Sequence, residues 1–408
     1  MLALCLATIS FPLILLILSP PAVPSVNDAL RGNTTALAND GFPYRGLTFL
    51  AVGDWGREGK HHQRKVARAM ARVARRVNLR FIVSTGDNFY EDGVTGLNDP
   101  QWRTSFEDVY RHEGLVNVPW FSILGNHDHL GNIKAQVGYS GGSHRWTMPA
   151  TYYSQEFDLH DGAVGGERVH FVFLDSTPYV KDVYGKAARK KNRQDPYEQT
   201  AWFEALLRNS TASKIVLIIH HHMYSMSIAG HFGTREIRAA LEPILLRYRH
   251  RVLAVISGHE HLLEHLQPYG GPDAWAGSAA SQPPPNRPPS RPATPRWPLS
   301  MWPAERKHKH GHHANETLHP NPQNPVIDYF ISGSGSLLDM LRRPPRGSEK
   351  IWTECCGVLP FSDDPSKPRA LMGLRSNGFF VFSISKSKFY AKAYNKLGEV
   401  VYAYEKSV

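Results

Sequence analysis
The amino-acid sequence predicts an α/β fold with two sheets, flanking helices and a functional site at the carboxyl ends of several strands. Apolar, β-branched runs alternate with stretches of helical periodicity, which is typical of parallel βαβ units. Two regions, 144–175 and 378–408, contain strand-like runs without helices between them, which indicates a second sheet and an antiparallel finish. Five of the apolar runs end directly in side chains that carry oxygen or nitrogen donors, at the edge where open α/β sheets bind ligands.

The bulk composition predicts a folded protein with a sizeable core. Of the 408 residues, 41% are hydrophobic and 11% are aromatic. The formal net charge of +11 would suit an anionic partner. The Lys and Arg residues of 60–77, however, fit the solvated outer face of a helix better than a nucleic-acid surface. We therefore expect no nucleic-acid partner, and we expect a monomer.

Residues 1–25 are predicted to be a signal peptide or an uncleaved signal-anchor. Residues 2–18 are largely apolar and a small-residue, proline-rich stretch follows them, but no Lys or Arg precedes them. Contact with a membrane is expected only if this leader is uncleaved. The sequons at Asn33, Asn209 and Asn315 predict a glycoprotein of the secretory pathway, either secreted or in a lysosome-like lumen.

The three cysteines do not predict a disulfide-stapled scaffold. Cys5 lies in the leader, and Cys355 and Cys356 are adjacent, so we expect free thiols or an unusual vicinal bridge.

Residues 45–408 are predicted to form one domain that begins with a βαβ unit. The predicted elements of its first part are a strand at 47–52, a helix at 60–77, a strand at 81–85, a helix near 100–112 and a strand at 120–124. The first helix is indicated by Val66, Met70 and Val73, which recur at helical spacing. The helix between the first two strands requires them to be parallel.

The second part changes character and then returns to the βαβ rhythm. Its predicted elements are strands around 151–154 and 168–175, a helix at 196–208, a strand at 214–219, a helix at 234–248 and a strand at 252–257. Residues 270–325 are rich in Pro and His and are interpreted as a low-complexity, solvated insert. Its histidines could also bind metal ions.

The third part is predicted to consist mainly of strands. These strands lie at 327–332, 378–384, 388–394 and 399–404, and the turn at 396–398 makes the last two antiparallel.

The donors at the five strand ends predict a metal site. They are Asp54, Asp87, Asn126, His222, His259 and His261. This set exceeds the needs of one four-coordinate ion and contains no cysteine, so it favours two adjacent ions bound by oxygen and nitrogen. Asp87 can bridge the two ions. Tyr90 follows three residues later, and its phenol would be a ligand only for a strong Lewis acid such as ferric iron. The alternative for Tyr90 is a buried aromatic residue with a satisfied hydroxyl.

These residues resemble the metal motifs of the purple acid phosphatases, especially the tartrate-resistant type, within the calcineurin-like metallophosphoesterases. The matching segments are Gly53-Asp54-Trp55-Gly56, Gly86-Asp87-Asn88-Phe89-Tyr90, Gly125-Asn126-His127, His222 and Gly258-His259-Glu260-His261. The resemblance implies a β-sandwich of two mixed sheets flanked by helices, with the metal site at the carboxyl ends of the strands. It implies a secreted or lumenal acid phosphatase that hydrolyses phosphate monoesters, with a metal-bound hydroxide as nucleophile.

The resemblance also assigns roles to residues. It implies a ferric ion held by Asp54, Tyr90, His261 and the bridging Asp87. It implies a divalent ion, which could be iron, zinc or manganese, held by Asp87, Asn126, His222 and His259. His127 and His231 match the histidines that contact the phosphate and assist the leaving group.

Two departures from the family pattern bear on these roles. The family has Gly-His where this chain has His221-His222, so the run of three histidines leaves the register open. We choose His222 because it precedes His231 by the family's separation, and His220 and His221 remain candidates. Gly230 stands where related enzymes often carry an acidic residue, which affects the expected pH optimum.

Two other functions are compatible with parts of the sequence. One is a colourless metallophosphoesterase of the protein phosphatase type, but those enzymes place a histidine where this chain has Gly56. The other is a non-catalytic metal-binding or interaction protein that acts through the insert at 270–325.

Overall fold

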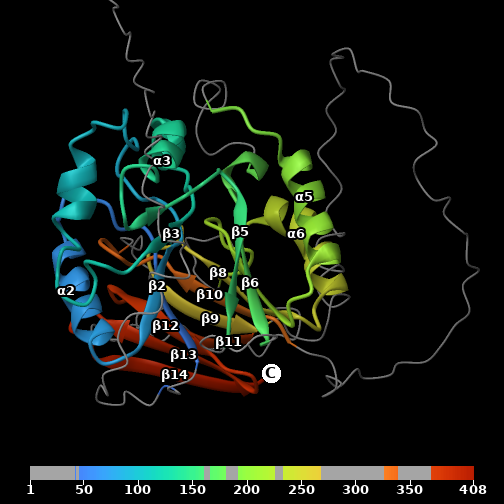
Figure 1. Ribbon diagram of the computed structural model, residues 1–408. Helices are drawn as coiled ribbons and strands as arrows, with labels where there is room; N and C mark the ends of the chain where they lie inside the picture. Colours follow the sequence, from blue (N-terminus) through green and yellow to red (C-terminus); the bar gives the residue numbers. More distant parts are fainter. Residues whose placement is uncertain are drawn as a thin grey trace, which may run out of the picture. The chain divides into compact units, whose positions relative to one another are not determined.

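The computed structural model describes residues 42, 46–159, 166–180, 192–225, 233–267, 326–338 and 369–408. These residues form two seven-stranded sheets, each with parallel and antiparallel pairs, and helices flank both sheets (Figure 1). The predicted α/β fold of two mixed sheets with flanking helices is confirmed.

The first sheet begins with the predicted βαβ unit. Strand β1 (Leu47–Val52) is buried along its whole length and pairs in parallel with β2 (Leu79–Ser84). Helix α2 (Gln63–Ala74) connects the two strands and buries Val66, Met70 and Val73, as the periodicity predicts. Strands β3 (Trp120–Ser122) and β4 (Trp146–Thr147) extend the parallel part of this sheet.

The C-terminal strands complete the first sheet on the other side of β1. Strands β12 (Gly378–Ile384), β13 (Lys388–Asn395) and β14 (Val400–Ser407) form an antiparallel meander, as predicted. Strand β12 pairs antiparallel with β1, so the C-terminal meander joins the sheet beside β1.

The second sheet has the order β11-β9-β10-β8-β7-β6-β5. Its strands are β5 (Tyr153–Asp158), β6 (Arg168–Phe173), β7 (Lys214–Ile218), β8 (Val252–Ser257), β9 (Leu263–Gln267), β10 (Asp328–Ser332) and β11 (Arg369–Leu374). Strands β6, β7, β8 and β10 run parallel, and helices α5 (Pro196–Asn209) and α6 (Arg235–Arg247) occur between β6 and β7 and between β7 and β8.

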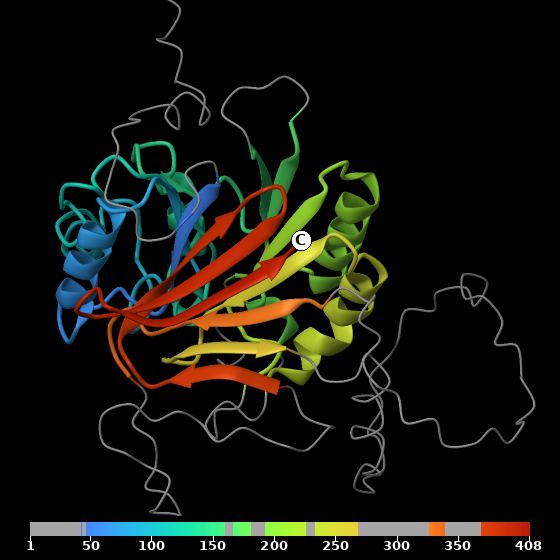
Figure 2. The ribbon, with the colours of Figure 1, turned by 90° about the horizontal axis from the view of Figure 1, so that it is seen from below.

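Aromatic side chains fill the space between the two sheets. Phe171 of β6 makes edge contacts with Phe49 of β1 and Phe81 of β2, at centroid distances of 5.0 and 5.2 Å. Phe330 of β10 contacts Phe382 of β12 in the same way at 5.0 Å. Figure 2 shows the C-terminal strands in red beside β10 in orange. The two sheets therefore pack as a sandwich.

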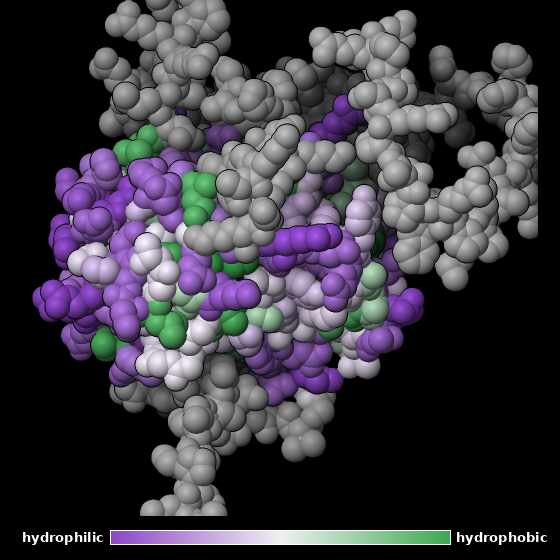
Figure 3. Space-filling model, turned by 90° about the horizontal axis from the view of Figure 1, so that it is seen from above, coloured by the Kyte–Doolittle hydropathy of each residue, from purple (hydrophilic) through white to green (hydrophobic). Residues whose placement is uncertain are grey.

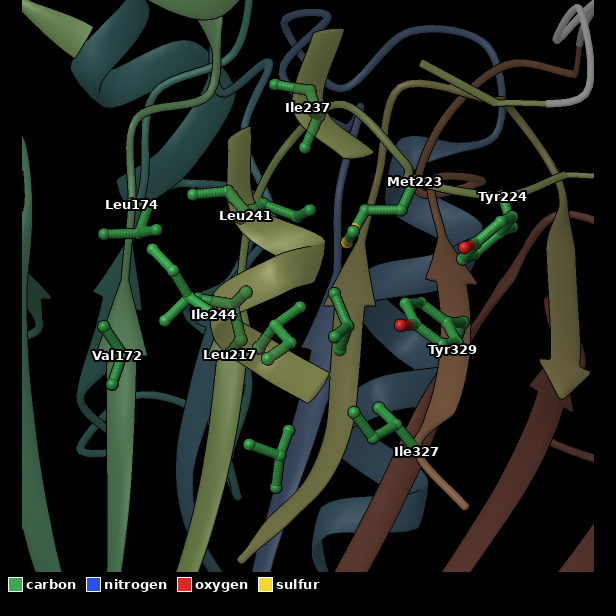
Figure 4. Close-up of a cluster of buried hydrophobic side chains, with 14 of the residues drawn as sticks. Val172, Leu174, Leu217, Met223, Tyr224, Ile237, Leu241, Ile244, Ile327 and Tyr329 are labelled. Carbon is green, nitrogen blue, oxygen red and sulfur yellow. The ribbon is translucent and has the colours of Figure 1, made fainter. Parts of the chain in front are cut away.

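A second hydrophobic cluster lies on the outer face of the second sheet. Leu241 and Ile244 of α6 pack over Val172 and Leu217 of the sheet, with Tyr329 in the same cluster (Figure 4). This packing fixes α6 against the second sheet.

Several elements differ from the prediction, and strands β4, β9 and β11 were not predicted. The helix expected near 100–112 is a six-residue π-helical turn, Trp102–Glu107. Its wider turn accompanies the burial of Trp102 and Phe106, which pack on Phe89 and Trp55 respectively. Helix α3 (Ile133–Tyr139) was not predicted, and it begins where the Asn132 side chain accepts a hydrogen bond from the backbone of Ala135.

Several predictions lie outside the described residues. They concern the leader, the adjacent cysteines, His231 and the insert at 270–325. No helix in the described part of the chain has the length and apolar character needed to cross a membrane. On the face shown in Figure 3, the coloured residues are mainly hydrophilic, and hydrophobic residues occur in small separate groups.

Candidate metal centre
The five predicted strand ends meet at one place between the two sheets. Strands β1, β2 and β3 of the first sheet and β7 and β8 of the second sheet all deliver their carboxyl ends there. Backbone hydrogen bonds connect these ends, from Asp54 N to Gly86 O within the first sheet and from Gly258 N to His220 O within the second, both at 3.0 Å. The ends of the two sheets also approach each other closely here. A Cβ added to Gly258 of the second sheet would lie 2.7 Å from Asp54 Oδ2 of the first sheet.

Three of the predicted ligands have an unusual backbone conformation. Asp54, Asp87 and His259 have φ values of 60°, 49° and 74°, in the left-handed region that favours glycine. Such a conformation costs on the order of 1–3 kcal/mol for a non-glycine residue and is concentrated at functional sites. This backbone conformation directs each side chain back over the end of its strand.

Four donor atoms, one of which is the Tyr90 hydroxyl oxygen, form a tight group. This oxygen lies 3.1 Å from Asp54 Oδ1, 3.0 Å from Asp87 Oδ2 and 3.1 Å from His261 Nε2. His261 Nε2 is also 3.5 Å from Asp54 Oδ1. Donors bound to one ion at about 2.1 Å lie about 3.0 Å apart in an octahedron and about 3.4 Å apart in a tetrahedron. The donor spacing therefore fits a single ion.

The electrostatics of this group also favour a cation. Burial, together with the carboxylates of Asp54 and Asp87, raises the pKa of Tyr90 well above its usual value. Burial likewise raises the pKa of Asp54. A cation among these donors would oppose both pKa shifts, because it stabilises the ionised phenol and carboxylate.

The second carboxylate oxygen of Asp87 faces a different set of donors. Asp87 Oδ1 accepts a hydrogen bond from His127 N at 2.8 Å and lies 3.5 Å from His220 Nε2. His220 Nε2 is 2.9 Å from Asn126 Oδ1 and 3.3 Å from His259 Nδ1. One oxygen of Asp87 thus belongs to each half of the site, which is the geometry expected of a carboxylate between two ions.

In the run His220–His222, the structure favours a different histidine from the one that the spacing to His231 predicts. The Nε2 atom of His220 lies within 3.5 Å of donor atoms of Asp87, Asn126 and His259. The His221 ring lies 4.5 Å from that of His259, and the His222 ring lies 5.8 Å from it. The structure therefore brings together six of the seven predicted metal ligands and places His220, rather than the seventh, His222, among their donor atoms.

The charge on His220 reflects this position. Burial disfavours a proton on its ring, but Asp87, Asp54 and the Thr85 carbonyl outweigh burial and raise the pKa of His220 to about 9. His259 is buried beside other imidazoles, and its pKa falls well below the usual value.

His127 lies at the exposed side of the same group. Its ring packs against that of Tyr90 at 4.4 Å, and its Nδ1 is 2.6 Å from Glu91 O. Its Nε2 lies 4.0 Å from Asp87 Oδ2, and the side chain remains 23% exposed. His127 is therefore both next to the Asp87 carboxylate and accessible from solvent. The second predicted catalytic histidine, His231, lies outside the described residues.

Two supporting residues were missed by the sequence analysis. Asp128 is buried and accepts hydrogen bonds from the backbone N–H groups of Asn88, Phe89 and Gly125 and from the Gln136 side chain. The Arg57 guanidinium lies 3.5 Å from the centre of the Tyr90 ring. Asp128 directly follows the Gly125-Asn126-His127 segment, and this position was the one signal that could have identified it.

Gly56 lies where a colourless relative would carry a histidine. A Cβ at this position would be 1.7 Å from the carbonyl oxygen of Asn88. The backbone of the Tyr90 segment thus occupies the space of a side chain at Gly56, and the donor on this side of the site is Tyr90.

Comparisons with known proteins identify the family of the chain. Residues 47–263 match the family model described as calcineurin-like phosphoesterase. The chain is 34% identical to tartrate-resistant acid phosphatase type 5 of Oryctolagus cuniculus over 234 residues, which cover 55% of this chain and 70% of that protein. It is 32% identical to purple acid phosphatase 17 of Arabidopsis thaliana over 282 residues, which cover 67% of this chain and 78% of that protein.

Two solved structures share the fold. Purple acid phosphatase PPD1 from yellow lupin (Lupinus luteus) seeds is similar with a TM-score of 0.53 and 12% identity, covering 89% of this chain and 54% of that chain. GAP50, described as the anchor in the inner membrane complex of Plasmodium, is similar with a TM-score of 0.58 and 21% identity, covering 89% of both chains. At these identities the two structures support the fold alone.

Proposed function
Since the chain belongs to the calcineurin-like phosphoesterase family, resembles its purple acid phosphatases and is therefore a phosphatase, we propose that it hydrolyses phosphate monoesters with a ferric and a divalent ion. Asp54, Tyr90 and His261 would hold the ferric ion, and Asp87 would bridge to the divalent ion. Asn126 and His259 would complete the divalent side with an imidazole from the run His220–His222.

The position of the Tyr90 hydroxyl carries this proposal. Its oxygen lies within 3.1 Å of three donors from β1, β2 and β8, of which two are carboxylates. An uncharged phenol has one proton and can donate it to only one of these carboxylates at a time. A phenolate at this place requires a strongly charged ion, which would contact all of these donors at once. Ferric iron is the ion that this donor set favours.

Bound ions at the two halves of the site would neutralise the phosphate and activate a water molecule at acidic pH. The chain's own residues would orient the ester and move a proton. His127 Nδ1 faces the carbonyl of Glu91, which can only accept a hydrogen bond, so the imidazolium form carries its second proton on Nε2. That proton faces the site and can stabilise a phosphate oxygen or the leaving group, a role that His231 would share.

The test is metal analysis of the purified protein, together with its visible spectrum and its phosphatase activity between pH 4 and 8. We expect a violet protein that contains iron, and we expect the Tyr90→Phe variant to lose or shift the visible band and to retain iron less well. Tyr110→Phe is the matched control, because Tyr110 is also fully buried but lies in the aromatic cluster around Trp55. A wild-type spectrum in Tyr90→Phe, or full activity without iron, would overturn the ferric assignment.

We also propose that the chain enters the secretory pathway. Asn209 of the sequon lies exposed at the end of α5, where an attached glycan would meet solvent. The expected observation is an endoglycosidase-sensitive gel shift that Asn209→Gln reduces, and an unshifted wild-type protein from the native cell would argue against it.

A further inference from the structure
We infer that His220, and not His222, binds the divalent ion through Nε2, and that His221 donates a hydrogen bond from Nε2 to an oxygen of the substrate's phosphate. The inference rests on the proposed two-metal function and concerns the three histidines that follow β7. It is carried by the hydrogen-bond partners of the His220 and His221 rings, which differ from each other.

The partner of His220 Nδ1 fixes the state of that ring. Nδ1 lies 2.8 Å from the backbone carbonyl oxygen of Thr85, which can only accept a hydrogen bond. Nδ1 therefore carries the proton, and in the neutral ring Nε2 presents a lone pair. A backbone carbonyl on the remote ring nitrogen is the usual arrangement that orients a metal-binding histidine.

The surroundings of His220 Nε2 fit a cation. Asn126 Oδ1 lies at 2.9 Å, His259 Nδ1 at 3.3 Å and Asp87 Oδ1 at 3.5 Å. These are the edge lengths of about 3.0–3.4 Å that donors around one ion should show. The ring packs against Gly86, where a Cβ would lie 2.6 Å from His220 Nδ1, so the backbone of β2 leaves a place for this imidazole.

The contacts of Ser176 place the ring proton of neutral His221 on Nε2, whereas that of His220 is on Nδ1. The hydroxyl oxygen of Ser176 accepts hydrogen bonds from the backbone N–H groups of His220 and His221, at 3.2 and 2.9 Å. Both lone pairs of this oxygen are then used, so its own hydrogen must go to His221 Nδ1, which is 2.8 Å away. The proton of neutral His221 is therefore on Nε2, which makes this nitrogen a donor and not a metal ligand.

The Nε2 donor of His221 has no partner among the described residues, although it is buried. A ring nitrogen of His221 lies within 4.8 Å of ring nitrogens of both His220 and His259. A buried donor without a partner costs about 1–3 kcal/mol, so a ligand that accepts its hydrogen bond gains correspondingly. A phosphate oxygen held next to the divalent ion would supply the missing acceptor.

His222 has a different role. Its backbone carbonyl accepts a hydrogen bond from Thr234 N at 3.0 Å, next to the start of α6. This backbone hydrogen bond connects the end of β7 to α6. The His222 ring is the most distant of the three histidine rings from the ring of His259.

The test compares His220→Asn, His221→Asn and His222→Asn in the full chain. An Asn side chain keeps a donor near the position of Nδ1 but has nothing at Nε2, so His220→Asn preserves the hydrogen bond to Thr85. Metal content is measured by elemental analysis, affinity for Zn²⁺ or Mn²⁺ by calorimetry, and binding of inorganic phosphate by titration of the metal-loaded protein. Circular dichroism shows that each variant is folded.

We expect His220→Asn to keep its iron and to bind the divalent ion at least 100-fold more weakly. His221→Asn should keep both ions and bind phosphate roughly 10-fold more weakly, and His221→Gln, whose amide nitrogen can replace Nε2–H, should restore the binding. His222→Asn should change neither quantity. Loss of the divalent ion from His222→Asn or His221→Asn, with His220→Asn unchanged, would overturn the inference. A wild-type protein that binds no second ion would instead refute the proposed function.

Discussion
At the scale of single residues, the site is built by side chains that face back over their own strand ends. Asp54, Asp87 and His259 adopt left-handed backbone conformations, and in each case the side chain reaches donors from another strand. The strained conformations persist because the surrounding hydrogen bonds and glycines leave no alternative. Gly125 is one example, since a Cβ there would lie 2.2 Å from Asp87 Oδ1.

Asp128 is the residue that holds two of these strand ends together. Its carboxylate accepts from Gly125 N at 2.8 Å and from Asn88 N and Phe89 N at 3.0 and 3.2 Å. In Asp128→Asn, one oxygen becomes an NH₂ group that cannot accept, so at least one buried N–H loses its partner. We expect the free energy of unfolding to fall by about 1–3 kcal/mol and the affinity for the divalent ion to fall as well, because Asn126 lies in the same turn.

Chemical denaturation and metal titration of Asp128→Asn check this prediction. Asp158→Asn is a suitable control, because it makes the same chemical change at a residue that is exposed at the end of β5. If the two variants were equally stable, Asp128 would not have the structural role described above.

Most of the side chains that the structure brings together at the strand ends were predicted from the sequence, but the histidine from the run of three that lies among them was not. Strand ends with Gly-Asp, Gly-Asn and Gly-His patterns predict donors at one edge of a fold, and the structure brings Asp54, Asp87, Tyr90, Asn126, His259 and His261 together there. The separation between His222 and His231 depends on the length of the intervening loop. Which histidine faces the site depends instead on where β7 ends, at Ile218, and on partners such as Thr85 and Ser176 that are distant in sequence.

At the scale of secondary-structure elements, a buried polar cluster joins β14 of the first sheet to β9 and β10 of the second. Asp328 is fully buried and pairs with Lys406 at 2.5 Å and with His265 at 2.9 Å. The other nitrogen of His265 lies 2.8 Å from the Tyr402 hydroxyl, and Tyr404 is 3.5 Å from Asp328. Each polar group has a partner, which is the condition for burying such a cluster without a large cost.

This cluster predicts a dependence of stability on pH. Burial lowers the pKa of His265 despite its contact with Asp328, so the unfolded chain binds a proton near pH 6.5 before the folded chain does. The contribution of His265 is therefore present above about pH 6.5 and is lost as the pH falls from there towards its folded pKa, by at most about 1.4 kcal/mol per pH unit. The pKa of Asp328 is also lowered, because His265 and Lys406 outweigh burial, and its contribution is lost only at more acidic pH, below about 4.

We expect His265→Gln to flatten this dependence between pH 7 and 4.5. Gln can bond to both Asp328 and Tyr402 but does not titrate, so the difference in unfolding free energy between wild type and variant should shrink as the pH falls. Urea unfolding at several pH values measures this difference. His170→Gln controls for histidine titration elsewhere, because His170 lies in β6 of the second sheet and its pKa is also lowered. A constant difference across the range would contradict the prediction.

The elements themselves were largely predictable, but their pairing was not. Helical periodicity located α2, α5 and α6, and alternation located the C-terminal meander. Nothing local in the sequence indicates that β12 pairs with β1, because that choice depends on contacts between distant residues, such as the stacking of Phe382 on Phe49 across the β1–β12 pair at 5.1 Å. The π-helical turn at Trp102–Glu107 was likewise unpredictable, since its hydrogen-bond pattern accompanies tertiary burial of its aromatic residues.

At the scale of the whole molecule, the metal centre depends on two sheets that are assembled from distant parts of the chain. Strand β10 belongs to the second sheet, and its last residue, Ser332, accepts a hydrogen bond from Gly53 N at 2.7 Å. Ser336 further donates to Asp54 O at 2.6 Å. The segment after β10 therefore buttresses the strand end that carries Asp54, although 278 residues separate Asp54 from Ser332 in the sequence.

The opposite end of β10 is where the insert at 270–325 joins the fold. Strands β9 and β10 are antiparallel neighbours, with Leu266 opposite Tyr329, and the Gln267 side chain donates to Asp328 Oδ1 at 2.8 Å. The chain thus leaves and returns at adjacent points, which a hairpin loop of a few residues could connect. These points lie at the amino end of β10, whereas the metal centre lies beyond its carboxyl end.

We therefore expect that replacing residues 270–325 with a short Gly/Ser linker preserves the fold and the metal centre. The melting temperature and the metal content should stay close to those of the wild type, and turnover of a small phosphomonoester should remain within about two-fold, because β9 and β10 keep their pairing with each other and with β11 and β8. A variant that keeps the length of the segment but scrambles its order separates an effect of chain length from an effect of its sequence. A large loss of turnover with both metals retained would contradict the expectation, and it would mean that the insert acts on substrate access from its attachment at the far end of β10.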